Sequence, residues 1–198
     1  DVALWRVLAC QQSAQRKIYL QRSGGLGDRL SAYIRDRIPL IDRMKKIGQF
    51  LLALLIPLTI GGVSGYFTVE AIPGWYRTIE KPEWNPPNWV FGPVWTTLYV
   101  LMGIAMYLIW TQPRTKNRQR ALYLYAAQLI LNFFWSLIFF NLHAIGWALI
   151  EILSMWVLIV TTMFAYDKVH KPAAWLLLPY IIWVSFATIL NFAIWRLN

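Results

Sequence analysis

Two amide side chains in the middle of the sequence are candidates for a polar site within an apolar environment. Gln128 and Asn132 lie four residues apart inside an apolar segment, so they share one face if that segment is a helix. Amides buried in a membrane commonly hold helices together by hydrogen bonds. The alternative is a pocket with two polar handles, because Trp135 and Phe139 continue the same face as aromatic walls.

Glu151 is the only acidic residue inside the long apolar segments. An ionisable group at membrane depth is a candidate functional residue by default, because its charge is costly to bring into lipid. The carboxyl group could also reach the membrane surface, or stay protonated as a structural hydrogen-bonding group. The sequence leaves these three alternatives open.

An aromatic stripe marks the last apolar segment. Tyr180, Trp183, Ala187 and Asn191 advance by three or four residues and therefore share one face of a helix. Packing in a core is the default interpretation of such a stripe, and contact with a ligand is the alternative.

Enzyme-like arrangements are missing from the sequence. No nucleophile is paired with a base, and there is no phosphate-binding loop or dinucleotide fingerprint. No group of Cys, His, Asp and Glu has metal-ligand spacing, so we expect neither a metal nor a cofactor. The single cysteine, Cys10, excludes an internal disulfide.

The composition is that of a membrane protein. Of the 198 residues, 58% are hydrophobic and only 14% are charged, whereas soluble domains carry about 25% charged residues. Ten of the nineteen Lys and Arg residues lie in positions 1–46. The net charge of +10 therefore belongs to a tail and loops rather than to a folded basic face, which argues against nucleic-acid binding.

Five apolar segments are long enough to cross a bilayer core of about 30 Å as helices. Short connections after the second segment make consecutive helices antiparallel neighbours. The sequence thus predicts an all-α protein, an integral membrane bundle of five transmembrane helices. The predicted spans are 47–69, 89–110, 121–140, 146–166 and 173–195.

Small residues and a proline predict features of these helices. Gly61 and Gly65 form a small-x-x-x-small pair, which serves either packing within the bundle or a dimer, and we favour internal packing. Pro179 should kink or distort the last helix, because proline lacks an N–H and its ring crowds the preceding turn.

Residues 1–46 form a basic N-terminal extension of unknown order, ahead of a transmembrane domain at 47–198. The extension is partly helical in pattern, and a break is expected at 23–27, where a serine is followed by three glycines within four residues. A basic segment beside a membrane is attracted to anionic lipid, which is the use that we expect for it.

Basic residues are distributed unequally between the two ends of the spans. Sixteen Lys and Arg residues lie on the side of the N-terminus and the 111–120 loop, against three on the other side. The positive-inside rule places that N-terminus in the cytoplasm, with the chain in a bacterial inner membrane. The mitochondrial outer membrane is the alternative for a eukaryotic chain.

The stretch 75–99 contains four tryptophans and four prolines. Pro82, Pro86 and Pro87 should hold an extended, stiff loop, and Pro93 should fall in the first turn of the next helix, where a proline is tolerated. The tryptophans could form an interfacial aromatic belt, or the loop could be the wall of a ligand pocket.

The run W-Y-x4-K-P-x-W-x-P-P-x-W-x-x-G-P-V-W-x-x-L-Y in this stretch resembles the translocator protein family (TspO/MBR, also called the peripheral benzodiazepine receptor family). The resemblance covers about residues 48–198. Two further features match it, namely the Q-x-x-x-N-x-x-W arrangement that ends at Trp135 and an acidic residue at the place of Glu151.

The resemblance implies a receptor or transporter-like membrane protein that binds hydrophobic tetrapyrroles, such as protoporphyrin IX or haem-type molecules, and benzodiazepine-type ligands. The pocket would open beneath the 75–88 loop, Asn132 would orient the ligand, and Trp95 and Trp183 would face each other across it. The expected ligand-binding residues are Trp84, Pro86, Trp95, Tyr99, Gln128, Asn132, Trp135, Glu151, Tyr180, Trp183 and Ala187.

The resemblance leaves other functions open. The chain could be an enzyme that degrades porphyrin with light or oxygen, with Trp95 and Trp183 as catalytic residues, or a membrane scaffold without a ligand. A sterol-binding or translocating role is a further alternative, although Phe192 breaks the family's sterol pattern, which requires a tyrosine. Since family members are often dimers, we expect a homodimer in the lipid bilayer.

Overall fold

The computed structural model describes residues 2–198 of the chain. Side chains are described for 39–198 apart from position 70, and ahead of these only at positions 11, 13, 15 and 33. The chain divides into two compact units, Asp1–Gly48 and Gln49–Asn198.

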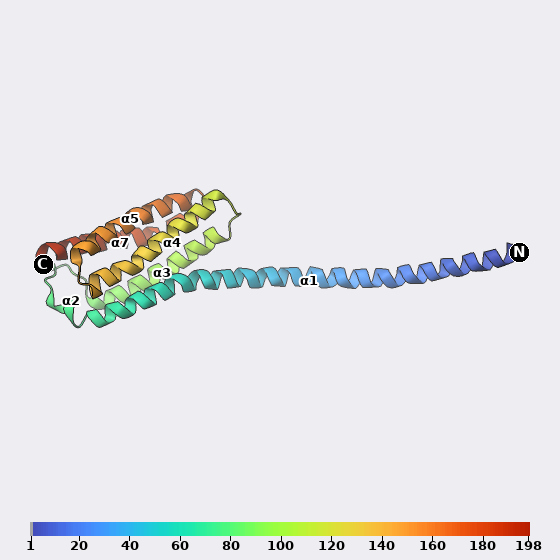
Figure 1. Cartoon of the computed structure of the whole chain (residues 1–198), viewed down its shortest axis with the longest axis horizontal. Helices are drawn as coiled ribbons and strands as arrows, with labels where there is room; N and C mark the ends of the chain where they lie inside the picture. The colour runs from blue at the N-terminus through green and yellow to red at the C-terminus, as the bar shows by residue number, and fades with distance from the viewer. Residues whose placement is uncertain (1) are drawn as a thin grey trace. The chain divides into compact units, whose positions relative to one another are not determined.

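The secondary structure is helical, and no β-strand occurs between residues 2 and 198. The all-α prediction is therefore confirmed. Figure 1 shows α3, α4, α5 and α7 as neighbouring helices of one bundle. The elements are α1 (Val2–Ala71), α2 (Trp75–Thr78), α3 (Asn88–Trp110), α4 (Lys116–Ser136), the π-helical turn η1 (Leu137–Asn141), α5 (Ile145–Asp167), α6 (Lys171–Trp175) and α7 (Leu178–Leu197).

Five helical segments are long and apolar enough to cross a membrane, as predicted. A helix suits this environment because it satisfies its backbone hydrogen bonds internally, where lipid offers no partners. Each predicted span lies within one of the observed segments, which are Pro39–Val69, Asn88–Trp110, Lys116–Asn141, Ile145–Asp167 and Lys171–Leu197.

Within the first unit, the helix continues through residues 23–27. The predicted break is therefore wrong. A glycine costs a helix only about 1 kcal/mol relative to alanine, so three glycines weaken the helical conformation without forbidding it.

The core of the second unit forms where four helices meet. Met102 of α3, Leu129 of α4, Met155 of α5 and Val184 of α7 are all buried in the same cluster of apolar side chains. These side chains hold the bundle together, and the helices around them position the cavity described below.

Glycines let α1 and α3 approach each other at two levels. The Cβ of a side chain at Gly103 would lie 2.8 Å from the carbonyl oxygen of Ala53, and a side chain at Gly61 would overlap the ring of Tyr99. The two helices are antiparallel, because Ala53 of α1 lies beside Gly103 of α3, whereas Gly61, later in α1, lies beside Tyr99, earlier in α3. The predicted internal packing thus holds for Gly61, whereas a Cβ at Gly65 would meet nothing within 4 Å.

Pro179 interrupts the last membrane segment, which confirms the predicted distortion. Helix α6 ends at Trp175, two residues follow in a turn, and α7 starts at Leu178 with Pro179 in its first turn. The position of the break follows from the chemistry of proline, because Pro179 cannot donate to the carbonyl of Trp175.

Pro93 lies in the interior of α3. The prediction that it falls in the first turn is therefore wrong, because α3 already begins at Asn88, with Pro87 as its N-cap at a φ of −57°. Pro93 consequently cannot donate a helical hydrogen bond to the carbonyl of Trp89.

Candidate ligand pocket

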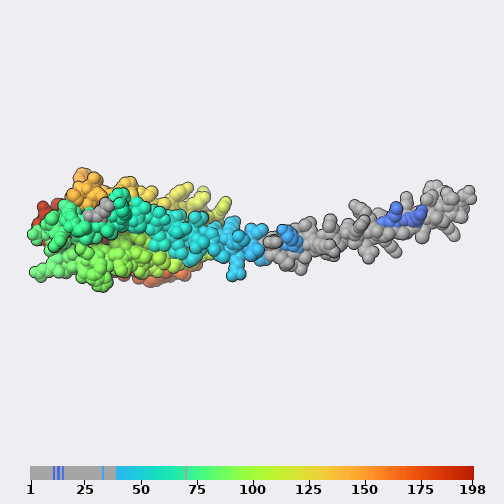
Figure 2. All heavy atoms as spheres, turned by 90° about the horizontal axis from the view of Figure 1, so that it is seen from below, coloured from blue at the N-terminus to red at the C-terminus, as the bar shows by residue number. Residues whose placement is uncertain are grey.

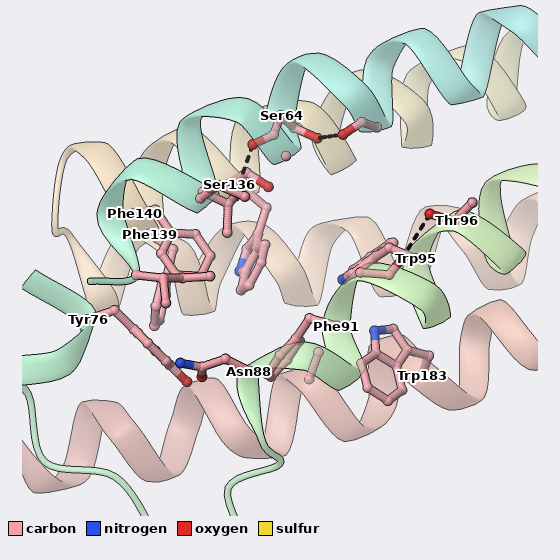
Figure 3. Close-up of a pocket in the computed structure, with 18 of the residues that line it drawn as sticks. Ser64, Tyr76, Asn88, Phe91, Trp95, Thr96, Ser136, Phe139, Phe140 and Trp183 are labelled. Atoms are coloured by element: carbon pink, nitrogen blue, oxygen red, sulfur yellow. Dashed lines mark hydrogen bonds between the residues drawn. The ribbon is translucent and has the colours of Figure 1, made fainter. Parts of the chain in front are cut away.

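A cavity of about 450 Å³ lies in the second unit, between α1, α3, the end of α4 with η1, and α7. Ligand sites for small molecules commonly measure roughly 300–1,000 Å³. Figure 3 shows side chains from these elements arranged around the cavity. Its aromatic lining residues are Tyr76, Trp89, Phe91, Trp95, Tyr99, Trp135, Phe139, Phe140 and Trp183.

The polar part of the lining is uncharged. The described lining residues include no Asp, Glu, Lys, Arg or His, and their polar groups are hydroxyls, side-chain amides and indole N–H groups. An apolar wall with a few polar groups suits a hydrophobic ligand that carries a small number of hydrogen-bonding atoms.

Helix α3 supplies one aromatic wall. Phe91, Trp95 and Tyr99 are four residues apart, and all three line the cavity. Trp95 stacks on Tyr99 with ring centroids 5.5 Å apart, and Phe91 meets Trp183 of α7 edge-on at 5.9 Å. These are favourable aromatic geometries, so the rings support one another before any ligand binds.

Trp95 and Trp183 lie on α3 and α7 at the same end of the cavity (Figure 3). Trp95 also meets Tyr180 edge-on at 6.3 Å, one turn before Trp183 on α7. Among the described residues, the indole N–H of Trp183 is buried without a hydrogen-bond acceptor. It can therefore donate to an acceptor atom of a ligand.

The π-helical turn η1 brings two adjacent phenylalanines to the cavity. Its wider turn ends with the N–H of Leu142 donating to the carbonyl of Leu137 at 3.0 Å. Phe139 stacks on Trp135 at 5.3 Å, and Phe140 contacts both of these rings while also lining the cavity. Single π-helical turns of this kind are frequent at functional sites.

Tyr76 borders the cavity at the loop end. It is buried, and its hydroxyl donates to Oδ1 of Asn85 at 3.0 Å. Burial raises the pKa of Tyr76 to about 12, and the hydrogen bond with Asn85 offsets part of that increase. The phenol therefore stays protonated at neutral pH and keeps donating to Asn85.

Several hydrogen bonds tie the loop between α2 and α3 in place. Nζ of Lys81 donates to the carbonyls of Tyr76 and Ile79 at 2.8 and 2.6 Å. The N–H of Asn85 donates to the carbonyl of Pro82 at 2.9 Å, which closes a turn. Residues 79–87 are non-helical, as the prolines predicted.

The tryptophans of the loop region lie in different surroundings. Trp84 is about half exposed and touches Phe186 edge-on at 5.9 Å, and Trp75 stacks on His143 at 4.2 Å. Trp95, by contrast, lines the cavity. The pocket wall therefore includes Trp95 of this stretch, and an interfacial role for Trp75 and Trp84 stays a prediction.

The buried amides of α4 join three helices. The hydroxyl of Tyr99 donates to Oδ1 of Asn132, Nδ2 of Asn132 donates to the hydroxyl of Tyr180 at 3.2 Å, and that hydroxyl donates to Oε1 of Gln128 at 2.9 Å. This chain connects α3, α4 and α7 behind the cavity. Of the two alternatives for these amides, the hydrogen bonds favour the one in which they hold helices together.

A third buried amide, that of Asn191, forms a hydrogen bond with the aromatic wall. Asn191 of α7 accepts the indole N–H of Trp135 at 3.2 Å and donates to the carbonyl of Ile145 at 3.1 Å. Trp135 is therefore held in its orientation towards the cavity by α7 and by the start of α5.

Glu151 is half-buried on α5 and does not line the cavity. Both of its carboxyl oxygens are buried, and neither has a hydrogen-bond partner within the described part of the chain. The geometry provides no salt-bridge partner that would favour a charged carboxylate at this depth.

The structure places the eleven predicted ligand-binding residues in two groups. Trp95, Tyr99, Trp135, Trp183 and Ala187 line the cavity. The others lie outside its lining, and their contact with a ligand stays a prediction; they are Trp84, Pro86, Gln128, Asn132, Glu151 and Tyr180.

Sequence reasoning missed the contribution of α1. Gly62, Ser64, Gly65 and Thr68 all line the cavity, and Ser64 is buried with its hydroxyl donating to the carbonyl of Gly61 at 3.2 Å. The available signal was the run of small residues in this helix, which is as typical of close packing as of a cavity wall.

Five membrane-spanning helices, four of which line an aromatic, uncharged cavity, define an integral membrane protein with a receptor-like architecture. Residues 53–196 match the model of the TspO/MBR family, and the chain belongs to this family. The resemblance carried by the Trp–Pro run is thereby confirmed.

Known relatives include bacterial and animal proteins. The chain is 41% identical over 155 residues to the tryptophan-rich protein TspO of Chlorobaculum tepidum. The aligned residues make up 78% of this chain and 98% of that protein. This chain is 44% identical over 126 residues to the translocator protein of Homo sapiens, covering 63% and 75% of the two chains. The tryptophan-rich sensory protein of Cereibacter sphaeroides is 40% identical over 124 residues, covering 63% and 77%.

Proposed function

We propose that this protein binds flat hydrophobic tetrapyrroles, such as protoporphyrin IX or haem-type molecules, in the cavity between α1, α3, η1 and α7. Benzodiazepine-type ligands would occupy the same space. The observation that carries the proposal is the lining, in which aromatic rings from α2, α3, α4, η1 and α7 surround about 450 Å³, with no charged side chain among the described lining residues.

Flat aromatic ligands match such a wall physically. A ring that stacks offset or edge-on against Trp, Tyr or Phe gains about 0.5–1.5 kcal/mol beyond the burial of its area. Trp95 and Trp183 offer faces and edges from two different helices. The free indole N–H of Trp183 would donate to a carbonyl or carboxylate of the ligand, and Asn132 would orient the ligand indirectly, through the hydroxyl of Tyr99.

A fluorescence titration tests the proposal. Purified protein in lipid vesicles is titrated with protoporphyrin IX, and we expect saturable quenching of tryptophan fluorescence. Trp183→Ala should weaken binding by about tenfold, since it removes a stacking face and an N–H donor worth together ~1.4 kcal/mol. The control is Trp147→Ala, which changes an exposed tryptophan outside the cavity lining. Quenching that never saturates would contradict the proposal.

A second candidate function is the degradation of bound porphyrin with light or oxygen. The contacts of Trp95 with both Tyr99 and Tyr180 favour it, because they place an oxidisable indole between the cavity and the buried hydrogen-bond chain. Trp95→Phe and Trp183→Phe should then spare binding and abolish product formation under illumination. Binding and turnover that fall together, or a wild-type protein that yields no product, would exclude this function.

The proposal extends to the setting of the protein. The excess of basic residues around the N-terminus and the 111–120 loop supports a bacterial inner membrane with that side in the cytoplasm, or the mitochondrial outer membrane for a eukaryotic chain. A homodimer is part of the proposal, and cross-linking in vesicles tests it. A sterol ligand is the weaker alternative, because Phe192 breaks the expected pattern.

A further inference from the structure

The cavity is closed on one side and open on another. On the wall formed by η1 and α7, Phe139, Leu190 and Ile194 are buried. The lining residues of α1 and α3 include strongly exposed ones, since Val69 and Trp89 keep 67% and 75% of their surface accessible. A residue that both lines a cavity and is exposed outside lies at its mouth, so the mouth lies between α1 and α3.

The mouth has two facing rows of residues, which we call the glycine window. Within each row the residues advance by three or four positions, so each row occupies one face of its helix. Because the helices are antiparallel, Val69 lies at the level of Trp89 and Gly62 at the level of Thr96. The window consists of Gly62, Gly65 and Val69 on α1 and of Trp89, Gly92 and Thr96 on α3.

The glycines of the window differ from those that pack helices. A Cβ at Gly62, Gly65 or Gly92 would meet no atom within 4 Å, whereas side chains at Gly61 and Gly103 would collide with the neighbouring helix. Close packing therefore does not require the three window glycines. Their missing side chains leave free space at the edge of the cavity.

The window faces the side of the bundle, where lipid surrounds a membrane protein. Thr96 lies eight residues into α3, about 12 Å along the helix from its start, so the window extends into a helix that is long and apolar enough to cross a membrane. Figure 2 shows that the last turns of α1 (teal) and the first turns of α3 (green) both reach the surface on this face. The contact of Gly61 with Tyr99 closes the window at its deep end.

The loop end of the cavity is held shut by comparison. Tyr76 is 5% exposed and donates a hydrogen bond to Asn85. Lys81 donates hydrogen bonds to two backbone carbonyls of the loop. The side chain of Asn198 also pairs with the backbone of Glu80 in both directions at 3.0 Å. A ligand that arrives from water would have to break several of these bonds, whereas a ligand in the membrane meets the open window.

We infer that flat, hydrophobic ligands reach the cavity from within the bilayer, through the glycine window between α1 and α3. The inference rests on the proposed function only for the identity of the natural ligand. The geometry serves any planar apolar molecule dissolved in the membrane, because the three glycines leave free space at the edge of the cavity.

Labelling of a cysteine at the closed wall tests this route without a tetrapyrrole. Ala187 lines the cavity on α7, so Ala187→Cys, in a Cys10→Ser background, reports arrival inside the cavity. The probe is a pyrene maleimide, which is flat and dissolves in phosphatidylcholine vesicles. We expect Gly62→Leu with Gly92→Leu to slow labelling about tenfold, and the single Gly92→Leu to slow it less.

Two controls make the result decisive. Gly48→Leu is the same substitution at a helical glycine that also has open space and does not line the cavity, so labelling should not change. Asn198→Ala loosens the loop and should not accelerate labelling if ligands come from the bilayer. Circular dichroism and labelling of the denatured protein show that each variant is folded and carries its cysteine.

Two outcomes would overturn the inference. The first is unchanged labelling in both window variants. The second is faster labelling in Asn198→Ala, together with reaction of a charged, lipid-insoluble methanethiosulfonate, which would place the route at the loop. No porphyrin is used in this experiment, so its outcome does not depend on the fluorescence titration. Failure of the titration would contradict tetrapyrrole binding without contradicting entry through the glycine window.

Discussion

The hydroxyl of Tyr99 donates to Oδ1 of Asn132 at 2.5 Å, and this bond joins the wall of the cavity to the buried amides of α4. Tyr99 also rests against Gly61 of α1 and stacks on Trp95. One side chain thus contacts α1, lines the cavity and anchors the hydrogen-bond chain behind it. Changes at this position should therefore affect both stability and ligand binding.

Removal of the Asn132 amide should destabilise the bundle. Asn132→Leu leaves the hydroxyl of Tyr99 buried without its acceptor, which should cost about 1–3 kcal/mol in the free energy of unfolding. Unfolding in mixed detergent micelles measures it, with Asn117→Leu as a control because Asn117 is exposed on the same helix. A double-mutant cycle with Tyr99→Phe should show a coupling of roughly 0.6–1.7 kcal/mol, and additive effects would contradict the bond.

Substitution by alanine should have opposite effects on stability at Gly103 and at Gly48. Gly103→Ala places a Cβ 2.8 Å from the carbonyl oxygen of Ala53, so α1 must move away at a cost of about 1–3 kcal/mol. Gly48→Ala meets no neighbour and should stabilise the helix by up to ~1 kcal/mol. Thermal unfolding of the two variants, measured side by side, checks the sign. Equal effects would show that α1 and α3 do not pack as described.

The two hydrogen bonds between the side chain of Asn198 and the backbone of Glu80 should protect the Glu80 amide from hydrogen exchange. Asn198→Ala removes the acceptor for the N–H of Glu80 and the donor to its carbonyl. Each hydrogen bond is worth about 0.5–1.5 kcal/mol net, so the Glu80 amide should exchange several-fold faster. Hydrogen exchange with mass spectrometry measures this. Amides in the middle of α5 serve as the reference and should exchange at unchanged rates.

Tyr76 should make the protein sensitive to alkaline pH. Its pKa is about 12 in the folded protein, whereas an exposed tyrosine titrates near 10. Above pH ~10 the unfolded chain therefore releases a proton that the folded protein retains, so ionisation favours unfolding. The stabilisation that the neutral phenol provides is fully present below pH ~10 and is lost as the pH rises through about 12.

Tyr76→Phe supplies the comparison for that titration. The variant lacks the ionisable group, so its stability should fall less than that of the wild type between pH 10 and 12. It also loses the hydrogen bond to Asn85, so it should be less stable than the wild type at pH 7. Parallel stability curves across the alkaline range would show that Tyr76 titrates normally in the folded protein.

The class of the protein could be predicted from the sequence because bilayers constrain chains severely. An uncharged run of about 20 residues must form a helix in lipid, so the number and approximate ends of the five spans follow from composition. The Trp–Pro run of 75–99 then indicated the family. Glycines at 23–27 and Pro93 misled local reasoning, because propensity is a weak guide when a long helix surrounds the residue.

The lining of the cavity was only partly predictable, because it depends on how helices are rotated and spaced. Trp84 and Trp95 belong to the same motif, yet one is half exposed beside Phe186 and the other lines the cavity. Phe140 reaches the lining from a π-helical turn, which a regular helical period does not predict. The spacing of residues along the sequence correctly predicted which of them share a helix face. It could not predict whether that face contacts another helix, the cavity or the surroundings of the protein.

Hydrophobicity and helical period act along the chain, so they were enough to predict a bundle of membrane helices with aromatic faces. The folded arrangement was needed to show that Gly61 packs against Tyr99 while Gly65 borders open space, and that Asn132 bonds to two tyrosines. Glycines one turn apart look alike in sequence. Which of them meets a neighbouring helix depends on how closely α1 and α3 approach at that level, and the side chain that meets Gly61 belongs to Tyr99, far away in the sequence.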